Sequence, residues 1–223
     1  MPSGSPPRPR LNRDRVVRAA VQLADGGGFD ALSMRKLAEQ LGVVPMALYK
    51  HVADKDELLD EMIDRVFAEV EVPDGCGWRT AMRERAAALR AALLRHPWAV
   101  GRMETGTPGP ANLRHHNAVM ACLRSEAGLG FRAAVHAYSA MDSYIYGFAL
   151  QEKTLSGDIP AEARRRGAVV ADRDESYAEL YPYLLEVVYE LSRTGYDLAQ
   201  EFEFGLDLIL DGIERLRSEF ASS

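Results

Sequence analysis

Apolar residues recur every three or four positions along most of this chain, which is the spacing of one face of an α-helix. The first such run places Val16, Ala20 and Ala24 on one face, after a capping residue at Asn12 and before three glycines at 26–28. The pattern therefore predicts a helix from Asn12 to Gly27. Residues 1–10 are Pro, Ser, Gly and Arg without periodicity, and we interpret them as a disordered arm.

Two short helices are predicted next. Ser33 can cap a helix that continues to Gln40, and Gly42 suits the left-handed conformation that closes such a helix. Pro45 is placed to open the following helix, because a residue at the first helical position needs no N–H.

A longer helix over 55–70 is predicted from Asp54 and Glu57, which have the spacing of a capping box. A segment with proline and glycine at 72–77 then interrupts the pattern. We take this interruption as a domain junction and call residues 11–71 the head and residues 77–221 the body.

The body continues with helical periodicity. Its predicted helices cover 78–95, 111–126, 131–153, 181–193 and 196–220. The polar segment 157–174, which contains three consecutive arginines, is interpreted as a mobile loop. Alternating patterns typical of strands are missing, so the predicted fold class is all-α.

Net charge changes the picture when it is divided along the chain. The whole chain is acidic, with a formal net charge of −6, which argues against a nucleic-acid partner. Up to Lys55, however, nine basic residues face five acidic ones, for a net +4, and the remainder carries −10. A small basic head on a large acidic body is a reason to expect nucleic-acid contacts in the head.

Other compartments and classes are disfavoured. A run of eighteen or more apolar residues is missing, and the N-terminus lacks the apolar centre of a secretory signal. Cys76 and Cys122 are too few for a disulfide framework and lack metal-ligand spacing. We therefore expect a cytoplasmic protein that does not associate with membranes and needs no cofactor or metal.

The segment 34–51 has the pattern of a helix–turn–helix. Ala38 is the small residue where two helices touch, and Gly42, four positions later, is a turn residue that tolerates positive φ. The apolar residues around them are Leu37, Leu41, Val43 and Leu48. The second helix then presents Met46, Tyr49 and Lys50 outward, as a helix entering a major groove would. An ordinary helical hairpin is the alternative.

These residues resemble the TetR family of bacterial transcriptional repressors. The matching stretches of the head are 12–27, 31–38, 42–43, 47–52 and 54–59. Body segments 92–96, 146–150 and 204–209 resemble the C-terminal domain of the tetracycline repressor. The resemblance implies an N-terminal three-helix helix–turn–helix DNA-binding domain, with a larger helical domain for ligand binding and dimerisation.

The resemblance implies that the chain is a ligand-responsive transcriptional repressor that binds double-stranded DNA. The head positions that match DNA-contacting positions are Ser33, Arg35, Pro45, Met46, Tyr49, Lys50, His51 and Lys55. Tyr49, His51 and Lys55 match phosphate contacts, and Arg35 matches a residue that reaches a base edge. Met46 and Lys50 lie where members vary, so they would set the sequence that is read.

Each of these assignments has a structural alternative. Tyr49 could pack against the first helix, His51 could simply close the second short helix, and Lys50 could be a solvated lysine. The arm, with Arg8, Arg10 and Arg13, could enter a minor groove or remain a solvated tail.

The body is expected to form a homodimer. The helices over 131–153 and 196–220 carry apolar residues on more than one face, and such helices must be buried against something. In the family they pair with their symmetry mates, and Gly205 would permit a close approach. A two-fold dimer places two recognition helices about 34–36 Å apart, so the operator should be a pseudo-palindrome.

The body is also expected to bind a small organic effector that releases the repressor. The candidate lining residues, carried over in register, are Arg85, Leu89, Met103, Pro108, His116, Val119, Val135, Tyr138 and Gln151. Core packing is the alternative for each of them. Trp98, Tyr138 and Tyr144 favour an effector with aromatic or flat apolar character.

The chain departs from the tetracycline repressor at two of these positions. A histidine and a glutamate of that protein, which bind its magnesium–drug chelate, are replaced here by Met103 and Gln151. Because Mg²⁺ prefers hard oxygen ligands, often carboxylates, we predict that magnesium–tetracycline does not bind.

The residues favour two other function classes less. An enzyme would have to use His115, His116, Asp142 or the cysteines, but adjacent histidines on a helix point about 100° apart and do not form a metal pair. A helical adaptor that binds another protein would use the hairpin only as structure. Steep loss of DNA affinity with salt would separate a repressor from both.

Overall fold

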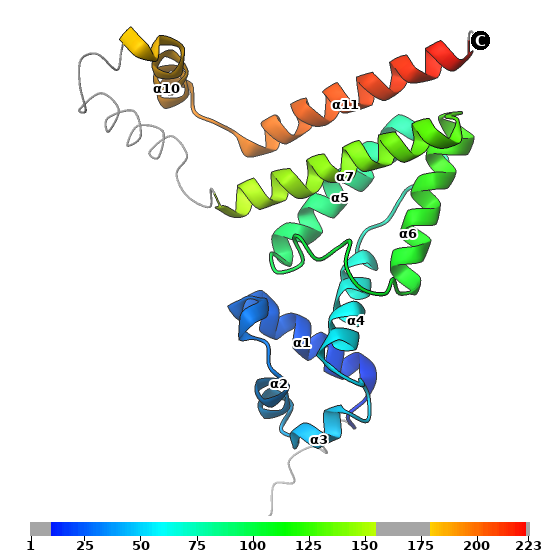
Figure 1. Ribbon diagram of the computed structural model, residues 1–223, viewed down its shortest axis with the longest axis vertical. Helices are drawn as coiled ribbons and strands as arrows, with labels where there is room; N and C mark the ends of the chain where they lie inside the picture. Colours follow the sequence, from blue (N-terminus) through cyan, green and yellow to red (C-terminus); the bar gives the residue numbers. More distant parts are fainter. Residues whose placement is uncertain (1–9, 155–178, 222–223) are drawn as a thin grey trace, which may run out of the picture. The chain divides into compact units, whose positions relative to one another are not determined.

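The computed structural model of the chain describes residues 10–154 and 179–221. Every regular element in these residues is helical, which confirms the all-α prediction (Figure 1). The chain divides into two compact units, residues 1–138 and 139–223, and the division falls inside α7 (Phe131–Thr154). The functional division between head and body at 72–77 is a different one and stays a prediction.

The head begins with α1 (Arg13–Gly27), and its ends are those that the sequence predicts. Asn12 Oδ1 accepts a hydrogen bond from the Arg15 N–H at 2.8 Å, and Gly28, with φ 75°, follows the last turn. A side-chain cap of this kind stabilises a helix by about 1 kcal/mol. The sequence pattern missed the short 3₁₀ turn Phe29–Ala31 that comes next.

Three further helices complete the head: α2 (Met34–Leu41), α3 (Pro45–Leu48) and α4 (Lys55–Phe67). The predicted starts are confirmed for all three, while α4 ends at Phe67, earlier than predicted. Their packing buries Val16 of α1, Leu37 of α2, Leu48 of α3 and Leu58 of α4 completely. Removal of each such side chain from water contributes about 2 kcal/mol, so this small core holds the head together.

The start of α4 is a variant of the predicted capping box. Asp54 Oδ1 accepts from the Glu57 N–H at 2.8 Å, and the Glu57 carboxylate accepts from the Ala53 N–H, one residue before the cap. Glu57 also accepts from Arg13 at 2.6 Å. The Ala53 N–H first, and the Arg13 guanidinium second, lower the pKa of Glu57 below its usual range. This carboxylate therefore joins the starts of α1 and α4.

Two body helices belong to the first unit, α5 (Trp78–Arg95) and α6 (Pro110–Ala121). The sequence predicted one helix over 111–126, but its last part, Cys122–Glu126, is a π-helical turn in which the Ala127 N–H bonds to the Cys122 carbonyl at 2.9 Å. Cys122 is buried there, and burial raises the pKa of its thiol to about 11. This cysteine is therefore an inert core residue.

The second unit contains the later part of α7, with α10 (Pro182–Thr194) and α11 (Leu198–Ala221). The α7 and α11 helices pack through aromatic rings: Tyr144 stacks on Phe202 with ring centroids 5.4 Å apart, and Phe148 meets Phe202 edge-on at 5.2 Å. Tyr144 also donates to the Phe202 carbonyl at 2.9 Å. A side chain at Gly205 would collide with Tyr144, so glycine permits this close approach.

Residues 1–9 of the arm and the predicted loop 157–174 lie outside the described residues. None of the described helices combines the length and the apolar character that a membrane span requires.

Candidate DNA-binding surface and effector site

The turn between α2 and α3 is built from local hydrogen bonds. Ser33 Oγ accepts from the Lys36 N–H at 3.2 Å and caps α2. Gly42 is in the left-handed conformation, with φ 68° and ψ 37°, and its N–H bonds to the Glu39 carbonyl at 3.1 Å. The Val43 N–H bonds to the Ala38 carbonyl at 3.0 Å. Because only glycine adopts this conformation without strain, the turn fixes the angle at which α3 leaves α2.

The predicted DNA-contacting residues lie on the outside of this hairpin. Met46 is 72% exposed, and Tyr49 remains 46% exposed. The other exposed members of the predicted set are Ser33, Arg35, Pro45 and Lys50. Arg35 pairs with Glu39 one turn later at 3.6 Å, with both side chains largely exposed. The structure thus leaves these side chains accessible to a partner.

His51 and Lys55 are half-buried and have contacts within the head. The His51 N–H donates to the Leu48 carbonyl at 2.8 Å, so its backbone closes α3. Lys55 Nζ lies 4.5 Å from the centre of the Phe29 ring, and the Arg102 guanidinium lies 3.9 Å from the same ring. Phe29 is therefore a residue that the motif missed, and it links the first residue of α4 to the segment after α5.

Arg13 does not belong to the N-terminal arm. It is the first residue of α1, and its guanidinium donates to Glu57 at 2.6 Å and to Glu61 at 2.8 Å. Hydrogen bonds from Arg13 to Glu61 and Glu57 raise its pKa further. The interpretation of Arg13 as part of a disordered arm is therefore wrong, because two carboxylates of α4 hold it against the folded head. Arg8 lies outside the described residues, and Arg10 is exposed.

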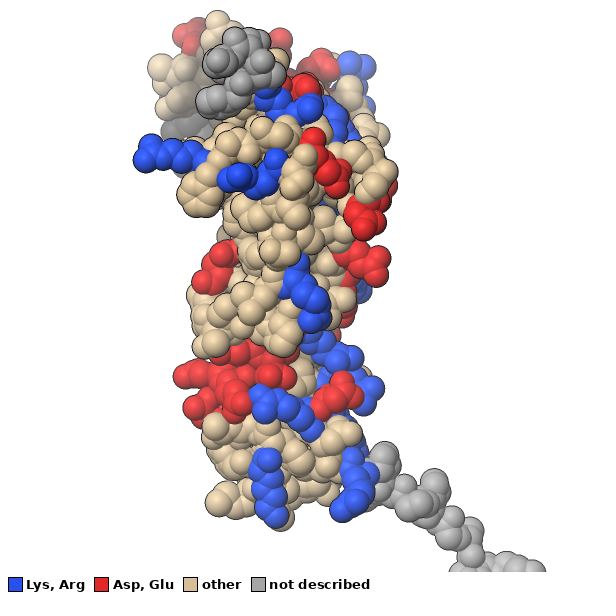
Figure 2. Space-filling model, turned by 90° about the vertical axis from the view of Figure 1, so that its right-hand side faces the viewer, with Lys and Arg blue, Asp and Glu red and all other residues tan. Residues whose placement is uncertain are grey.

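Charge is unevenly distributed over this unit. Figure 2 shows Lys and Arg side chains, with few acidic ones, around the end formed by the helix–turn–helix, and a band of Asp and Glu above it. The residues of α4 that supply negative charge include Asp60, Glu61 and Asp64. On this face, the end formed by the helix–turn–helix therefore suits a polyanion.

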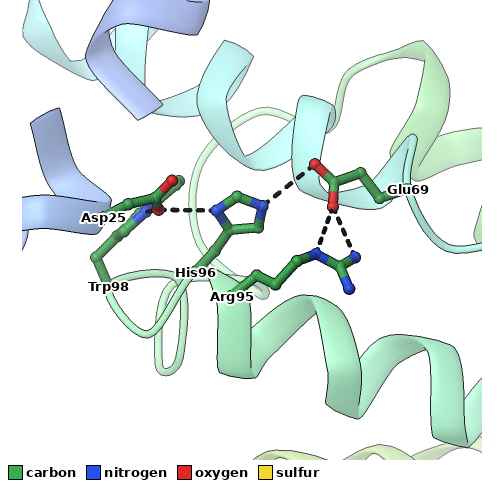
Figure 3. A network of polar contacts seen from close by, with 5 residues as sticks. All are labelled: Asp25, Glu69, Arg95, His96 and Trp98. Atoms are coloured by element: carbon green, nitrogen blue, oxygen red, sulfur yellow. Dashed lines mark hydrogen bonds and ion pairs between the residues drawn. The ribbon is translucent and has the colours of Figure 1, made fainter. Parts of the chain in front are cut away.

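A polar network joins the head to the first body helix (Figure 3). His96, which follows α5 and is almost buried, has Nδ1 2.8 Å from Asp25 Oδ1 and Nε2 3.2 Å from Glu69 Oε1. Trp98 donates its indole N–H to Asp25 at 2.7 Å, and Arg95 donates to Glu69 at 2.8 Å. Burial raises the pKa of Glu69, but Arg95 and His96 outweigh it and the net shift is downward. The ends of α1, α4 and α5 therefore meet at one imidazole.

A second joint connects α4 to the segment before α6. Asp60 Oδ2 accepts from the Thr107 N–H at 3.1 Å, and Asp64 Oδ1 accepts from the Asn112 N–H at 2.8 Å. A side chain at Gly106 or Gly109 would overlap these two carboxylates. Asp64 therefore supplies the cap for the N-terminus of α6 from a different helix, and the two glycines make room for it.

Three predicted effector residues line one hollow beside this joint. Its volume is about 270 Å³, and its walls are Met103, Glu104, Thr105, Gly106, Pro108, Asn112, Leu113 and His116. His116 Nδ1 lies 2.8 Å from the Asn112 carbonyl of its own helix. The hollow combines apolar walls with a few polar groups, which is the usual character of a small-molecule site.

Arg85, His116 and Tyr138 form a second group beneath α6. The Arg85 side chain is fully buried, and its Nε–H donates to His115 Nε2 at 3.1 Å. The Arg85 guanidinium lies 5.7 Å from the centre of the Tyr138 ring, which in turn meets the His116 ring at 5.4 Å. Burial, and secondly the charge of Arg85, lower the pKa of His115 to about 3. His115 is therefore neutral, and sequence reasoning missed its place here.

The remaining predicted residues do not line the hollow at Met103, Pro108 and His116. Leu89 and Val119 are completely buried in the core of the first unit, as the packing alternative requires. Val135 is 41% exposed, and Gln151 is exposed on the part of α7 that belongs to the second unit. Trp98 and Tyr144, which pointed to an aromatic effector, are engaged by Asp25 and by the α11 backbone. Of these three aromatic residues, only Tyr138 still supports an effector with aromatic character.

A larger hollow lies where α4 ends. Its volume is about 460 Å³, and its walls come from the end of α4, the connecting segment to Asp74 and α6. The sequence pattern marked this connection only as a domain junction. Its wall includes His115, whose Nδ1 atom lies 3.4 Å from the Val70 carbonyl oxygen. In the sequence, only the hydrophobic residues Val70, Val72 and Pro73 could have indicated this hollow.

Comparison with known proteins identifies both parts of the chain. Residues 16–62 match the family of bacterial regulatory proteins called tetR, and residues 72–217 match the tetracyclin repressor-like C-terminal domain. The transcriptional repressor DrrR1 of Streptomyces coeruleorubidus is 35% identical over 222 residues, 94% of this chain and 80% of that protein. The class A tetracycline repressor of Escherichia coli is 34% identical over 213 residues, 93% of each.

Solved structures agree. Apo ActR of Streptomyces coelicolor superposes with a TM-score of 0.79 at 30% identity, covering 94% of this chain and 97% of that one. ActR in complex with actinorhodin gives 0.77 at 31% identity, covering 92% and 97%. Relatives of this length and similarity, together with the two domain matches, leave one conclusion: the chain belongs to the TetR family of bacterial transcriptional regulators and is a helix–turn–helix DNA-binding repressor, not an enzyme.

Proposed function

We propose that the chain binds a pseudo-palindromic operator as a homodimer and leaves it when a small organic effector binds the body. The α2–α3 hairpin is the observation that supports operator binding. A capped α2 and a left-handed glycine hold α3 in place, and Arg35, Met46 and Lys50 remain exposed. Tyr49, His51 and Lys55 would contact phosphates, and Ser33 and Pro45 would approach the groove from the helix starts.

The dimer is supported by the two faces of α11. Phe202, Leu206 and Leu210 are buried on one face, while Phe204 and Leu208 are 66% and 61% exposed on the other. Apolar side chains at this exposure, on a helix that already has a packed face, favour contact with a second copy of the chain. A two-fold pair would place two α3 helices on successive major-groove faces.

The effector would enter the hollow lined by Met103, Pro108 and His116. Because its walls adjoin Gly106 and Asn112, which face Asp60 and Asp64 of α4, a ligand there could alter how α4 is held. Actinorhodin, which is bound in a solved structure of ActR, supports an organic molecule as the ligand class. Met103 is almost buried and offers a thioether where a hard oxygen ligand would be needed, so magnesium–tetracycline should not bind.

A mobility-shift titration of the full chain with DNA from upstream of its own gene tests the operator part. We expect retarded complexes whose affinity falls steeply as salt rises, because bound Lys and Arg release counterions. Tyr49→Ala combined with Lys55→Ala should weaken binding at least tenfold, while Leu94→Ala on α5 should leave it unchanged. Unchanged affinity for the double variant would reject the assigned docking face. Absence of salt-sensitive binding there and at neighbouring promoters would favour the alternative, a helical adaptor for another protein.

A thermal-shift screen of organic compounds tests the effector part. A ligand that binds only the folded chain raises Tm. A compound that raises Tm and also releases the operator supports the proposal, since the two binding events must be coupled reciprocally. Met103→Ala or His116→Ala should reduce both effects together. A ligand whose binding survives both substitutions would place the site elsewhere.

A further inference from the structure

Three apolar residues in and beside α3 form an exposed group that does not contribute to the core of the head. Among the described residues of the head, the large hydrophobic side chains that are well exposed are Val44 (68%), Met46 (72%) and Tyr49 (46%). All three lie in or beside α3, while Leu48 of the same helix is completely buried. Three exposed apolar side chains at one short helix, rather than scattered singly over the head, point to a site of contact.

Val44 is also a poor choice for the position it holds. It is the N-cap residue of α3, with φ −78° and ψ 146°, and its side chain makes no capping hydrogen bond. Ser, Thr, Asp or Asn at this position would cap the helix with a side-chain hydrogen bond and stabilise it. A local rule that is broken without a gain in packing points to a requirement of function.

Neither Val44 nor Met46 can donate a hydrogen bond to a base edge, and Pro45 between them has no side-chain donor either. In the major groove one base group is apolar, the C5 methyl of thymine, and apolar side chains distinguish T·A pairs by contact with it. Arg35 and Lys50 are also exposed and can supply the polar contacts.

We infer that Val44 and Met46 read thymine methyl groups, so that each operator half-site presents T·A pairs to the start of α3. This inference rests on the proposed operator binding and specifies its sequence preference. The contact is apolar, so it adds affinity without adding to the salt dependence, which the phosphate contacts set.

The test uses a duplex selected by the full chain from a random-sequence library. Each thymine of the selected half-site is replaced in turn by deoxyuridine, which removes the methyl group and leaves every hydrogen-bonding group in place. At the contacted positions we expect the affinity to fall about fourfold, the effect of one buried methyl group, with an unchanged salt slope.

The protein side is tested with Met46→Ala and Val44→Ala. Since both side chains are exposed, the variants should fold normally, with thermal denaturation as the control. In the matching variant, deoxyuridine at the contacted position should have no further effect, because the two changes remove one contact. Selected half-sites in which no thymine is sensitive, or a sensitivity that both variants retain, would overturn the inference. Failure of the selection to yield any specific duplex would instead count against the proposed function.

Discussion

The two candidate sites of the first unit are built in opposite ways. The DNA-binding surface is held by contacts within a few residues: Ser33 caps the start of α2, and the Gly42 N–H closes its end by bonding to the Glu39 carbonyl three residues earlier. The hollow at Met103 and His116 is held from a distance, by Asp60 and Asp64 of α4. Local contacts keep a binding surface rigid, whereas contacts between distant segments can change when a ligand enters. We therefore expect the helix–turn–helix to stay fixed and the contacts beside the hollow to adjust when a ligand binds.

The largest effect is expected where the local scaffold is broken, at Gly42. Its φ of 68° is costly for residues with a Cβ, and most costly for β-branched ones. Gly42→Val should lower the free energy of unfolding by about 2 kcal/mol and abolish operator binding. Gly42→Asn, which tolerates the left-handed region, should lose much less of both. Denaturant unfolding and mobility shifts measure the two, and equal losses for the two variants would contradict the argument.

The same contrast explains how far the sequence predicts this molecule. Asn12, Ser33, Pro45 and Asp54 each act on their own helix, so the starts of α1 to α4 follow from the sequence. Three predicted members of the effector site, Met103, Pro108 and His116, do meet in one hollow, but the family register carried that prediction. Leu89 and Val119 look equally suitable in sequence and are core residues, because burial depends on packing between distant segments.

Two other features escaped prediction for a related reason. The π-helical turn Cys122–Glu126 keeps the helical spacing of apolar residues, so periodicity cannot separate it from α6. Asp64 lies inside α4, and nothing in its sequence neighbourhood shows that it caps α6 through the Asn112 N–H. Contacts of that kind are visible only in three dimensions.

The next largest effect concerns acid stability, through His115. Its folded pKa of about 3 lies below the unfolded value of about 6.5, so the unfolded chain binds the proton first as pH falls. Stability from this residue is therefore lost between pH 6.5 and pH 3, by about 2 kcal/mol on going from pH 7.5 to pH 5. His115→Gln can keep both hydrogen bonds without titrating. Urea unfolding at the two pH values should show a smaller loss for the variant, and identical losses would refute the assignment.

A smaller effect is expected at the long-range joint. Asp64→Ala leaves the Asn112 N–H at the start of α6 without its acceptor, which should cost about 1–2 kcal/mol. Asp64→Asn keeps the accepting oxygen and should cost less. Hydrogen exchange separates the two regions: amides in the first turn of α6 should exchange faster in Asp64→Ala, while those of α2 stay protected. Equal acceleration in α2 would mean that the two sites are not held independently.

The smallest change in stability is expected at Glu39, and it tests the surface itself. Glu39 pairs with Arg35 at 3.6 Å, but both side chains are largely exposed, and such pairs contribute at most a few tenths of a kcal/mol. Glu39→Gln should therefore leave Tm almost unchanged. Operator affinity should nevertheless rise two- to threefold at low salt, because the variant removes a negative charge from the DNA-facing side and releases Arg35 for a base or phosphate contact. Glu190→Gln, which breaks the corresponding exposed pair with Arg193 on α10, is the matched control and should change neither quantity. A gain in affinity of the same size for both variants would show that net charge alone is responsible, whereas a gain confined to Glu39→Gln would place the exposed side of α2 at the DNA.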